Sequence, residues 1–443
     1  MNPVNVGLLG VGTVGGGAAL VLARNADDIT RRTGMPIRII HAAGLGLDPA
    51  APPPGAERAQ LTENPFDVVN NPEVDIIAEL IGGHGVAREL VLQAIDNGKH
   101  VVTANKALIA LHGNEIFAAA RRRGVMVAFE AAVAGGIPII KALREGLTAN
   151  RIQWIAGIIN GTSNFILSQM RDHGHSFDSA LQQAQDLGYA EADPTFDIAG
   201  TDAAHKLTIL AAIAFGIPLQ FDACFTAGID ALTPEDVGYA QELGYRIKHL
   251  GIARRTADGV ELRVHPTLIP ERRLIANVDG VMNAILVAGD RTGPTLYYGA
   301  GAGAEPTASA VVADIIDIAR ARNNAPEHAV PHLAFQPDRM TDNLPILPMD
   351  AVTTAYYLRL SARDEPGVMA DVARILSDAG ISIEAVLQKA PLGAAETIPI
   401  ILLTHQVRES AMNTAIAMIE ALPSIKSPVS RIRVEHLGAY QRD

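Results

Sequence analysis

The sequence predicts an α/β protein with three structural parts. Apolar strand patterns alternate with helical patterns up to about residue 150, which is typical of a doubly wound parallel sheet. Antiparallel strand patterns follow and indicate an α+β module. Residues 355–437 then alternate in the order βαββαβ, the ferredoxin-like arrangement. With 443 residues, 48% of them hydrophobic, the chain is long enough to build two or three cores.

Composition excludes several classes of protein. The net charge is −12 without a basic stripe, which argues against nucleic acid as a partner. The single cysteine, Cys224, excludes an internal disulfide framework, and its apolar and acidic neighbours favour a buried small residue over a nucleophile. We find no signal-peptide pattern and no apolar stretch long enough to cross a membrane, so we expect a cytoplasmic protein without membrane partners.

A glycine-rich turn follows the first strand. Residues 3–9 form a short apolar run, Gly10, Gly12 and Gly15 follow it, and a helical pattern covers residues 14–25. Strand, GxGxxG and helix together place a pyrophosphate on a helix N-terminus. The pattern predicts a Rossmann-type domain that binds NAD or NADP, and the alternative is a purely structural glycine turn.

The next strands predict the rest of the cofactor cleft. The strand at 37–43 ends without an acid to hold the ribose, and the first acid is Asp48, so the choice between NAD and NADP stays open. A strand at 74–80 leads to Gly82, where the backbone allows close approach of a ligand. A helix at 88–97 and a strand at 99–103, ending in Thr103, follow.

Lys106 and the turn at residues 130–138 are two further candidates. Lys106 follows the strand that ends in Thr103, so it is placed either to reach cofactor or substrate, or in water at a helix start. A helix at 107–123 and a strand at 125–129 precede the turn. Its small residues leave backbone carbonyls that suit a hard cation, and a close-packed turn is the alternative.

An acidic stretch ending in a lysine is the most prominent chemical feature of the chain. A strand at 151–159 and a helix at 165–171, opened by residues 161–164, precede it. That opening suits either a bound carboxylate or simple capping. A helix at 178–186 then leads to four acids and a lysine: Glu191, Asp193, Asp197, Asp202 and Lys206.

Asp202 and Lys206 are spaced i and i+4 on a helix that we expect Thr201 to cap. The same face continues with apolar residues, so Lys206 is expected to emerge from a buried stripe, where its proton affinity can be tuned. A solvated acidic loop with a snorkelling lysine is the alternative.

The remaining elements complete the predicted division of the chain. Strands at 260–268 and 280–288 belong to the second module, and the glycines at 299–303 start a helix at 308–321 that returns to the first domain. The predicted domains are a dinucleotide-binding domain (1–150, with 300–322), a substrate and dimerisation domain (151–322), a linker (323–353) and a regulatory domain (354–443).

Four stretches together resemble homoserine dehydrogenase over about residues 1–325. They are GLLGVGTVGGG (7–17), TANKALIA (103–110), GTSNFI (161–166) continuing to GYAEADPTFDIAGTDAAHK (188–206), and GAGAEPTASAVVAD (301–314). The stretch ARDEPGVMADVARILSDAGISIE (362–384) looks like an ACT domain, a small-ligand regulatory module. The combination resembles the monofunctional form of the enzyme.

The resemblance implies reversible reduction of L-aspartate 4-semialdehyde to L-homoserine with NAD or NADP. It implies Lys206 as proton donor or acceptor, Lys106 as the second active-site lysine, and substrate contacts from Glu191, Asp197 and Asp202. Cofactor positions would be Gly10, Gly12, Thr13, Val14, Gly82, Thr103, Lys106 and Gly303. A sodium site would be formed by Glu130, Val133, Gly135 and Ile137.

The resemblance also implies regulation and assembly. We expect threonine or a similar end product to bind near Asp364, Gly367 and Val368, and a homodimer or homotetramer because ACT units usually pair. Two other functions stay open: a non-catalytic sensor of nucleotides and amino acids, and another amino-acid dehydrogenase. The small residues that end the strand at 37–43 depart from the Arg-Asp that relatives often carry there.

Overall fold

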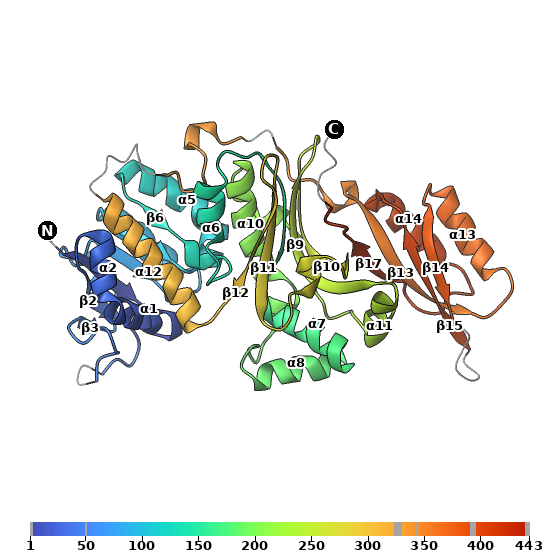
Figure 1. The fold of residues 1–443 in the computed structure, drawn as a ribbon, viewed down its shortest axis with the longest axis horizontal. Coiled ribbons are helices and arrows are strands. Elements are labelled where there is room, and N and C mark those ends of the chain that lie inside the picture. Colours follow the sequence, from blue (N-terminus) through green and yellow to red (C-terminus); the bar gives the residue numbers. More distant parts are fainter. Residues whose placement is uncertain (1–2, 49–50, 323–329, 342–343, 390–395, 439–443) are drawn as a thin grey trace. The chain divides into compact units, whose positions relative to one another are not determined.

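The structure, a computed structural model, describes residues 3–48, 51–322, 330–341, 344–389 and 396–438 (Figure 1). Its contacts divide the chain into two compact units. Unit 1 comprises residues 1–161, 202–224 and 281–344, and unit 2 comprises residues 162–201, 225–280 and 345–443. The two units do not coincide with the domains predicted from the sequence, whose boundaries were placed at residues 150 and 322. That division into domains remains a prediction.

Unit 1 contains the expected doubly wound sheet. Its six parallel strands lie in the order β3-β2-β1-β4-β5-β6, so the order reverses direction between β1 and β4. Such a reversal opens a ligand crevice at the carboxyl ends of the strands. The strands are β1 (Val4–Leu9), β2 (Ile37–Ala43), β3 (Gln60–Thr62), β4 (Ile76–Glu79), β5 (His100–Thr103) and β6 (Val127–Ala128).

Helices cover this sheet, as Figure 1 shows for α1, α2 and α12. They are α1 (Thr13–Arg24), α2 (Ala26–Thr33), α3 (Pro65–Asn70), α4 (Val86–Asp96), α5 (Lys106–Arg123) and α12 (Ala304–Ala321). The helices α1 and α12 approach closely at Gly17, where an added Cβ would lie 3.0 Å from the carbonyl oxygen of Ala304. The helix α12 begins four residues earlier than its apolar pattern predicted. It packs on the nucleotide-binding sheet, as predicted for the segment that returns to the first domain.

Unit 1 also holds three antiparallel strands and the buried helix α10 (Thr201–Phe215). The strands are β7 (Ile152–Ile158), β11 (Met282–Gly289) and β12 (Gly293–Ala300), with β11 between the other two. Thr201, expected as the cap of the helix, is its first residue. Shorter turns are η1 (Glu130–Ala132), α6 (Ile139–Lys141), η2 (Ala142–Gly146), η3 (Phe221–Ala223) and η6 (Pro337–Arg339).

Unit 2 is built on a sheet in the order β9-β10-β17-β13-β15-β14. These strands are β9 (Tyr245–Arg255), β10 (Val260–Pro270), β17 (Ser430–Val434), β13 (Thr353–Arg363), β15 (Thr397–Thr404) and β14 (Ile383–Gln388), with β8 (Phe225–Thr226) beside β10 and β16 (Val407–Arg408) beside β13. Its helices are α7 (Gly161–His173), α8 (Phe177–Asp186), α9 (Thr195–Ile198), α11 (Pro234–Glu242), η4 (Leu274–Asn277), η7 (Met349–Ala351), α13 (Val368–Asp378) and α14 (Glu409–Glu420). The helix α7 begins at Gly161, so residues 161–164, which were expected to open the helix, form its first turn.

The C-terminal part has the predicted order β13-α13-β14-β15-α14-β17, which confirms the ferredoxin-like arrangement. Its last strand, β17, pairs on one side with β13 and on the other, in parallel, with β10. Arg263 of β10 is fully buried and binds Glu261 and Glu435 at 2.9 and 2.5 Å. The regulatory module and the strands at 245–270 therefore share one sheet, which the sequence pattern did not predict.

Candidate active site

The glycine turn after β1 has the features of a dinucleotide cradle. Gly10 has φ +90°, which favours glycine, and an added Cβ at Gly15 would lie 1.9 Å from the carbonyl oxygen of Gly10. An added Cβ at Gly12 would meet nothing within 4 Å. Gly12 therefore leaves open space at the start of α1, where Thr13 and Val14 begin the helix and its N–H groups favour an anion.

A buried carboxylate supports the second cofactor loop. Glu79 ends β4, is fully buried, and accepts hydrogen bonds from the backbone N–H groups of Ile81 and Gly82 at 3.0 and 3.2 Å. Its other oxygen accepts from the Thr103 hydroxyl at 2.7 Å. The Thr103 side chain, predicted at the cofactor, thus holds this loop in place, and Gly82 lies where φ is +81° with space around it.

Asp202 joins the two lysines of the predicted site. One of its carboxylate oxygens lies 3.0 Å from Nζ of Lys106, and the other accepts from Nζ of Lys206 at 2.7 Å. The Asn160 amide donates to the same carboxylate at 2.9 Å, and Lys206 also donates to the carbonyl of Ile159 at 2.8 Å. Lys106 follows β5 and Lys206 lies on α10, so the fold brings two separate motifs together.

Burial decides between the alternatives for these side chains. The Lys206 side chain is 12% exposed, that of Asp202 is 4% exposed, and that of Lys106 is 34% exposed. Lys206 is therefore not a snorkelling lysine in a solvated loop, and Lys106 is a partly shielded partner of Asp202. The sequence did not single out Asn160 as a site residue, although it directly precedes the GTSN motif.

The electrostatics of the site favour an ionised Asp202. Burial alone would raise the pKa of this carboxyl. The charges of Lys206 and Lys106, with hydrogen bonds from Lys206 and Asn160, outweigh burial and hold the pKa well below its usual range. Asp202 also lies in the first turn of α10, where the helix dipole stabilises a negative charge.

The other two acids predicted for the substrate belong to unit 2. Glu191 is exposed in the loop between α8 and α9, and Asp197 is partly buried on α9. The first turn of α7 holds this segment, because Thr162 donates to the carbonyl of Tyr189 at 2.7 Å and Ser163 donates to that of Asp197 at 3.1 Å. Their role toward substrate remains a prediction.

The predicted cation turn is compact and buried. Ala134 has φ +53° and Gly135 has φ +34°, so two successive residues take left-handed conformations. The Glu130 carboxylate accepts from the N–H groups of Ile140 and Lys141 at 2.9 and 2.8 Å, which closes the turn. Val133 and Ile137 are buried in the same turn. The carbonyl oxygens of Glu130 and Ile137 each accept one backbone hydrogen bond, from Val133 at 3.3 Å and from Ile139 at 2.7 Å. The donors of the turn are therefore oxygens, which fit a hard cation better than a thiol- or imidazole-binding metal.

The predicted effector turn precedes α13. Asp364 and Gly367 are exposed, Gly367 has φ +98° at the N-cap, and Val368 is buried as the first helical residue. Gly303 occupies the same kind of position before α12, with φ +118°. Both turns start a helix, but neither location by itself identifies a ligand.

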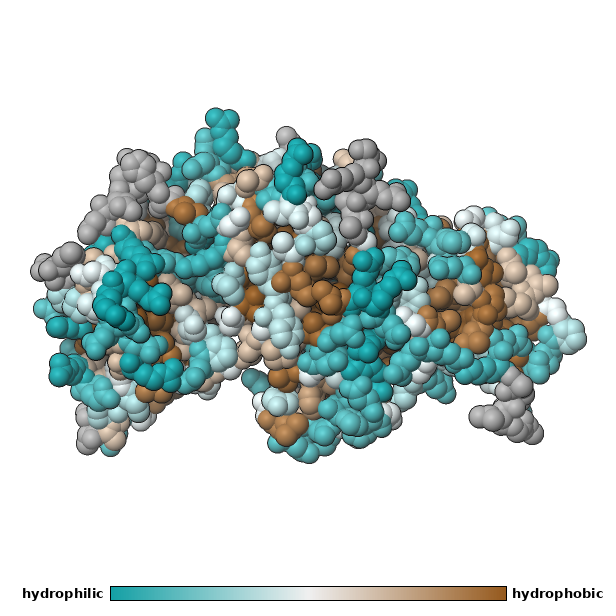
Figure 2. Space-filling view, viewed as in Figure 1, coloured by the Kyte–Doolittle hydropathy of each residue, from teal (hydrophilic) through white to brown (hydrophobic). Residues whose placement is uncertain are grey.

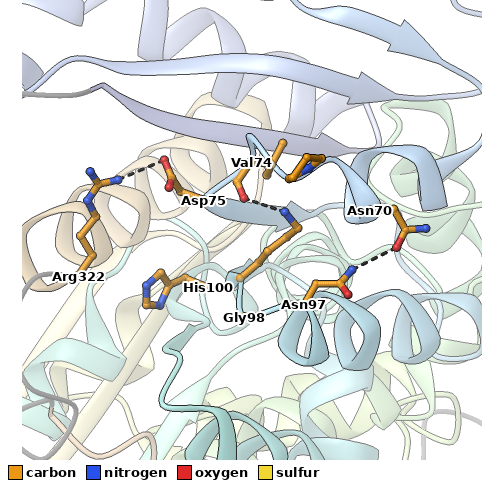
Figure 3. Close-up of a pocket in the computed structure, with 9 residues that line it drawn as sticks. Asn70, Val74, Asp75, Asn97, Gly98, His100 and Arg322 are labelled. Atoms are coloured by element: carbon orange, nitrogen blue, oxygen red, sulfur yellow. Dashed lines mark hydrogen bonds and ion pairs between the residues drawn. The ribbon is translucent and has the colours of Figure 1, made fainter.

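A polar cavity of about 610 Å³ lies at the amino-terminal ends of the strands of the nucleotide-binding sheet (Figure 3). Most of its residues directly precede β4 and β5, so it is distinct from the cofactor crevice at the carboxyl ends. Its charged groups are occupied within the protein: Lys99 donates to the carbonyl of Val74 at 2.8 Å, and Arg322 pairs with Asp75 at 3.1 Å. We interpret Lys99 as a clamp between loops rather than a ligand-binding group.

None of the helices among the described residues combines the length and apolar character that a membrane span needs. No group of three or more His, Cys, Asp or Glu side chains in that part of the chain is arranged to hold a metal ion.

Comparison with known families gives three matches. The homoserine dehydrogenase family model matches residues 138–316, the model of the homoserine dehydrogenase NAD-binding domain matches residues 10–130, and the ACT domain model matches residues 356–417. Together the three matches follow the order that the sequence motifs predicted.

Individual relatives match over nearly the full length. Homoserine dehydrogenase of Pseudomonas aeruginosa is 63% identical over 438 residues, covering 99% of this chain and 100% of the relative. That of Neisseria gonorrhoeae is 58% identical over 437 residues, with the same coverage. The crystal structure of a homoserine dehydrogenase from Thiobacillus denitrificans has a TM-score of 0.94 and 68% identity, covering 99% of both chains.

A more distant structure is that of a hyperthermophilic archaeal homoserine dehydrogenase in complex with NADPH. It has a TM-score of 0.60 and 26% identity, and it covers 71% of this chain and 97% of its own.

Proposed function

The chain belongs to the homoserine dehydrogenase family and is an NAD(P)-dependent oxidoreductase, and we propose that Lys206 exchanges the proton in its reaction. The observation that supports this role is the shared carboxylate: Asp202 binds Lys206 and Lys106 at 2.7 and 3.0 Å beside the nucleotide-binding sheet. A lysine held in this way is positioned and shielded from bulk water, as a proton-transfer group requires.

In the reducing direction, a nicotinamide cofactor held at the glycine turn would supply the hydride for the aldehyde carbon of L-aspartate 4-semialdehyde. The carbonyl oxygen then gains negative charge, and the Lys206 ammonium gives it a proton to form the hydroxyl of L-homoserine. Lys106 stabilises the same oxygen by its charge. Asp202 keeps both ammonium groups in place and balances their charge. In the oxidising direction, neutral Lys206 takes the hydroxyl proton.

The remaining roles follow the motif positions. We propose that Glu191 and Asp197 of unit 2 bind the substrate ammonium, since carboxylates are the natural partners of that group. Asp202 serves as positioning residue for the lysines. The proposed cofactor contacts are Gly10, Gly12, Thr13, Val14, Gly82, Lys106 and Gly303, with Thr103 acting through its bond to Glu79.

The central test replaces Lys206. We expect Lys206→Met to lower kcat by roughly 10²–10⁴-fold while leaving NADPH binding unchanged, because general acid catalysis contributes about this factor. Lys206→Arg should keep the charge but lose turnover, since a guanidinium does not release its proton near neutral pH. The control is Lys426→Met, an exposed lysine of unit 2. Near-normal turnover in Lys206→Met would exclude the role.

A sodium ion is proposed at the turn formed by Glu130, Val133, Gly135 and Ile137. The support is the small, buried turn with its left-handed Ala134 and the buried carboxyl group of Glu130. Thermal stability should rise with Na⁺ at constant ionic strength, relative to a large organic cation. A Tm that is indifferent to the cation would contradict the site.

Threonine is proposed as the effector of the ACT domain, at the turn of Asp364, Gly367 and Val368. Because β17 is shared between the ACT domain and β10, a point substitution is a better test than deletion of the domain. Gly367→Val should abolish inhibition by threonine and leave uninhibited kcat unchanged. Full activity of the unmodified enzyme in excess threonine would reject this effector.

We also propose that the chain forms a homodimer or homotetramer and works in the cytoplasm. Figure 2 shows hydrophobic residues at the surface over β14 and β15, and Val386 on the edge strand β14 is 48% exposed. An apolar edge of this kind is usually covered by a partner. Light scattering that gives a monomer mass at assay concentrations would contradict the assembly.

A further inference from the structure

A second cavity, of about 790 Å³, lies in unit 1 beside the C-terminal half of α5. Phe117, Leu333 and Phe335 form apolar walls, and Arg121 and Arg122 line it from the last turn of α5. Its volume falls in the range of small-molecule sites, and apolar walls with a few convergent polar groups are typical of such sites. Neither the reaction nor the cofactor cradle uses any of these residues.

The walls of this cavity are held in place by specific contacts. The Asn114 side chain donates to the carbonyl of Leu219 and accepts from its N–H, at 3.0 and 3.1 Å, which fixes the neighbouring loop on α5. His332 stacks on Phe117 with ring centroids 4.9 Å apart, and its Nε2 accepts from the N–H of Val127 at 3.2 Å. Burial lowers the pKa of His332 to about 4, so this ring is neutral at physiological pH and serves as an acceptor.

Residues 330–341 form the opposite wall and are anchored at Gly216. The ring of Phe335 packs on this glycine so closely that an added Cβ would lie 2.9 Å from it. The N–H of Thr341 donates to the carbonyl of Gly216 at 2.9 Å. The segment was predicted as part of a linker, but these residues pack against unit 1 and shape a concave surface.

The charge of the cavity is strongly one-sided. Within the described part of the chain, neither Arg121 nor Arg122 has an ion pair or hydrogen bond from its side chain, and no acidic residue lines the cavity. Glu115, whose pKa is lowered in part by the charge of Arg122, is bound by Arg88 at 2.7 and 2.8 Å. Arg121 and Arg122, both exposed, therefore line the cavity without a directly paired carboxylate among the residues that the structure describes.

We propose that this cavity binds a small organic anion with an aromatic or branched aliphatic body and a carboxylate. Guanidinium groups bind carboxylates through paired hydrogen bonds, and aromatic walls accept the apolar body. The absence of a lining carboxylate disfavours a zwitterionic amino acid, because its ammonium group would lose water without gaining a partner. The expected ligand thus differs in class from the substrate and from threonine.

The test titrates the full-length protein with 4-phenylbutanoate and, separately, with neutral 4-phenylbutan-1-ol, followed by ligand-detected NMR. We expect the carboxylate to bind about tenfold more tightly than the alcohol, in keeping with hydrogen bonds to charged groups. Arg121→Gln with Arg122→Gln should remove this preference. Phe335→Ala should weaken both probes, and because Phe335 is 39% exposed the variant should fold normally.

The matched control is Arg123→Gln. Arg123 belongs to the same helix end but pairs with Asp96 at 3.3 Å and does not line the cavity. Arg123→Gln should leave the affinities for both probes unchanged. If it lowers the affinity for the carboxylate as much as the Arg121 and Arg122 substitutions do, only the general charge of the helix end matters and the proposed site is wrong. Equal binding of acid and alcohol, or no binding at millimolar concentration, would also overturn it. The readout does not depend on turnover, so it is separate from the proposed role of Lys206.

Discussion

At the residue scale, Asp202 combines two functions in one side chain. It holds two ammonium groups that would otherwise repel each other, and its burial shields Lys206 from water more than Lys106. A shared carboxylate of this kind links catalytic geometry directly to stability, because the same contacts serve both.

Replacing Asp202 by Asn should therefore lower both activity and stability. A carboxylate whose pKa is lowered in the folded state stabilises it above the unfolded pKa, near 3.9, and loses this contribution as the pH falls. At pH 7 we expect a loss of about 1–3 kcal/mol in the free energy of unfolding, as for hydrogen bonds to charged groups. The difference between wild type and variant should be constant from about pH 5 to pH 8 and shrink below about pH 4.

Urea denaturation across this pH range measures the effect. Asp258→Asn, at an exposed position, is the control and should show no such pH-dependent difference. If the difference in unfolding free energy between wild type and Asp202→Asn grows at low pH, Asp202 is not the stabilising carboxylate proposed here.

The residue scale also shows what sequence spacing can and cannot predict. The i, i+4 spacing of Asp202 and Lys206 predicted their contact, since one helix fixes it. The contact between Asp202 and Lys106 depends on tertiary packing that brings the first turns of α10 and α5 together, and it follows from no local rule. Glu79 was missed because a single acid at a strand end has no periodic signal, although its place directly before the loop of Gly82 is informative.

At the element scale, two glycines of the turn after β1 are required for different reasons, one for packing of the fold and the other for space at the cofactor site. Gly15 is needed because the backbone of Gly10 leaves no room for a side chain, whereas Gly12 faces open space. We expect Gly15→Ala to lower the melting temperature clearly, since the strand, turn and helix cannot pack. Gly12→Ala should keep the melting temperature but raise the KM for NADPH by about tenfold or more, through a clash with the pyrophosphate. Thermal denaturation and steady-state kinetics of both variants check this contrast, and similar melting temperatures for the two would contradict it.

Most long elements of the chain were predictable. β2 matches its predicted range, and α5 differs by one residue, because apolar periodicity and turn residues agree there. The helix α2 was missed because it is almost entirely polar, and only Ile29 is buried. The strands β9 and β12 were missed because β9 carries charged residues that are buried by tertiary contacts, and β12 is a half-exposed edge.

At the scale of the whole molecule, buried charges join the ACT domain to the rest of unit 2. Burial would raise the pKa of Glu435, but Arg263 and Arg254 lower it to about 2. Removing one partner of a buried ion network leaves the other charges uncompensated, which typically costs about 3–5 kcal/mol. We expect Glu435→Gln to lower the unfolding free energy of unit 2 by about this amount at neutral pH.

The affinity for the cofactor serves as the property that Glu435→Gln should leave unchanged. The nucleotide-binding sheet belongs to unit 1, so the affinity for NADPH should not change in Glu435→Gln. Glu384→Gln, on an exposed position of β14, is the matched control. Calorimetry that finds the same melting profile for Glu435→Gln and wild type would contradict the structural role.

The position of β17 has a consequence for synthesis on the ribosome. Strand β10 is complete at residue 270, yet its neighbour is formed by residues 430–434, which leave the exit tunnel about 160 residues later. At typical elongation rates this is a delay of about 8–30 seconds, during which Thr267 and Leu268 of β10 lack their pairing partner in the nascent chain. During this period the nascent chain has unpaired backbone groups on β10 that chaperones can protect. Premature termination before residue 430 leaves these groups without their strand partner.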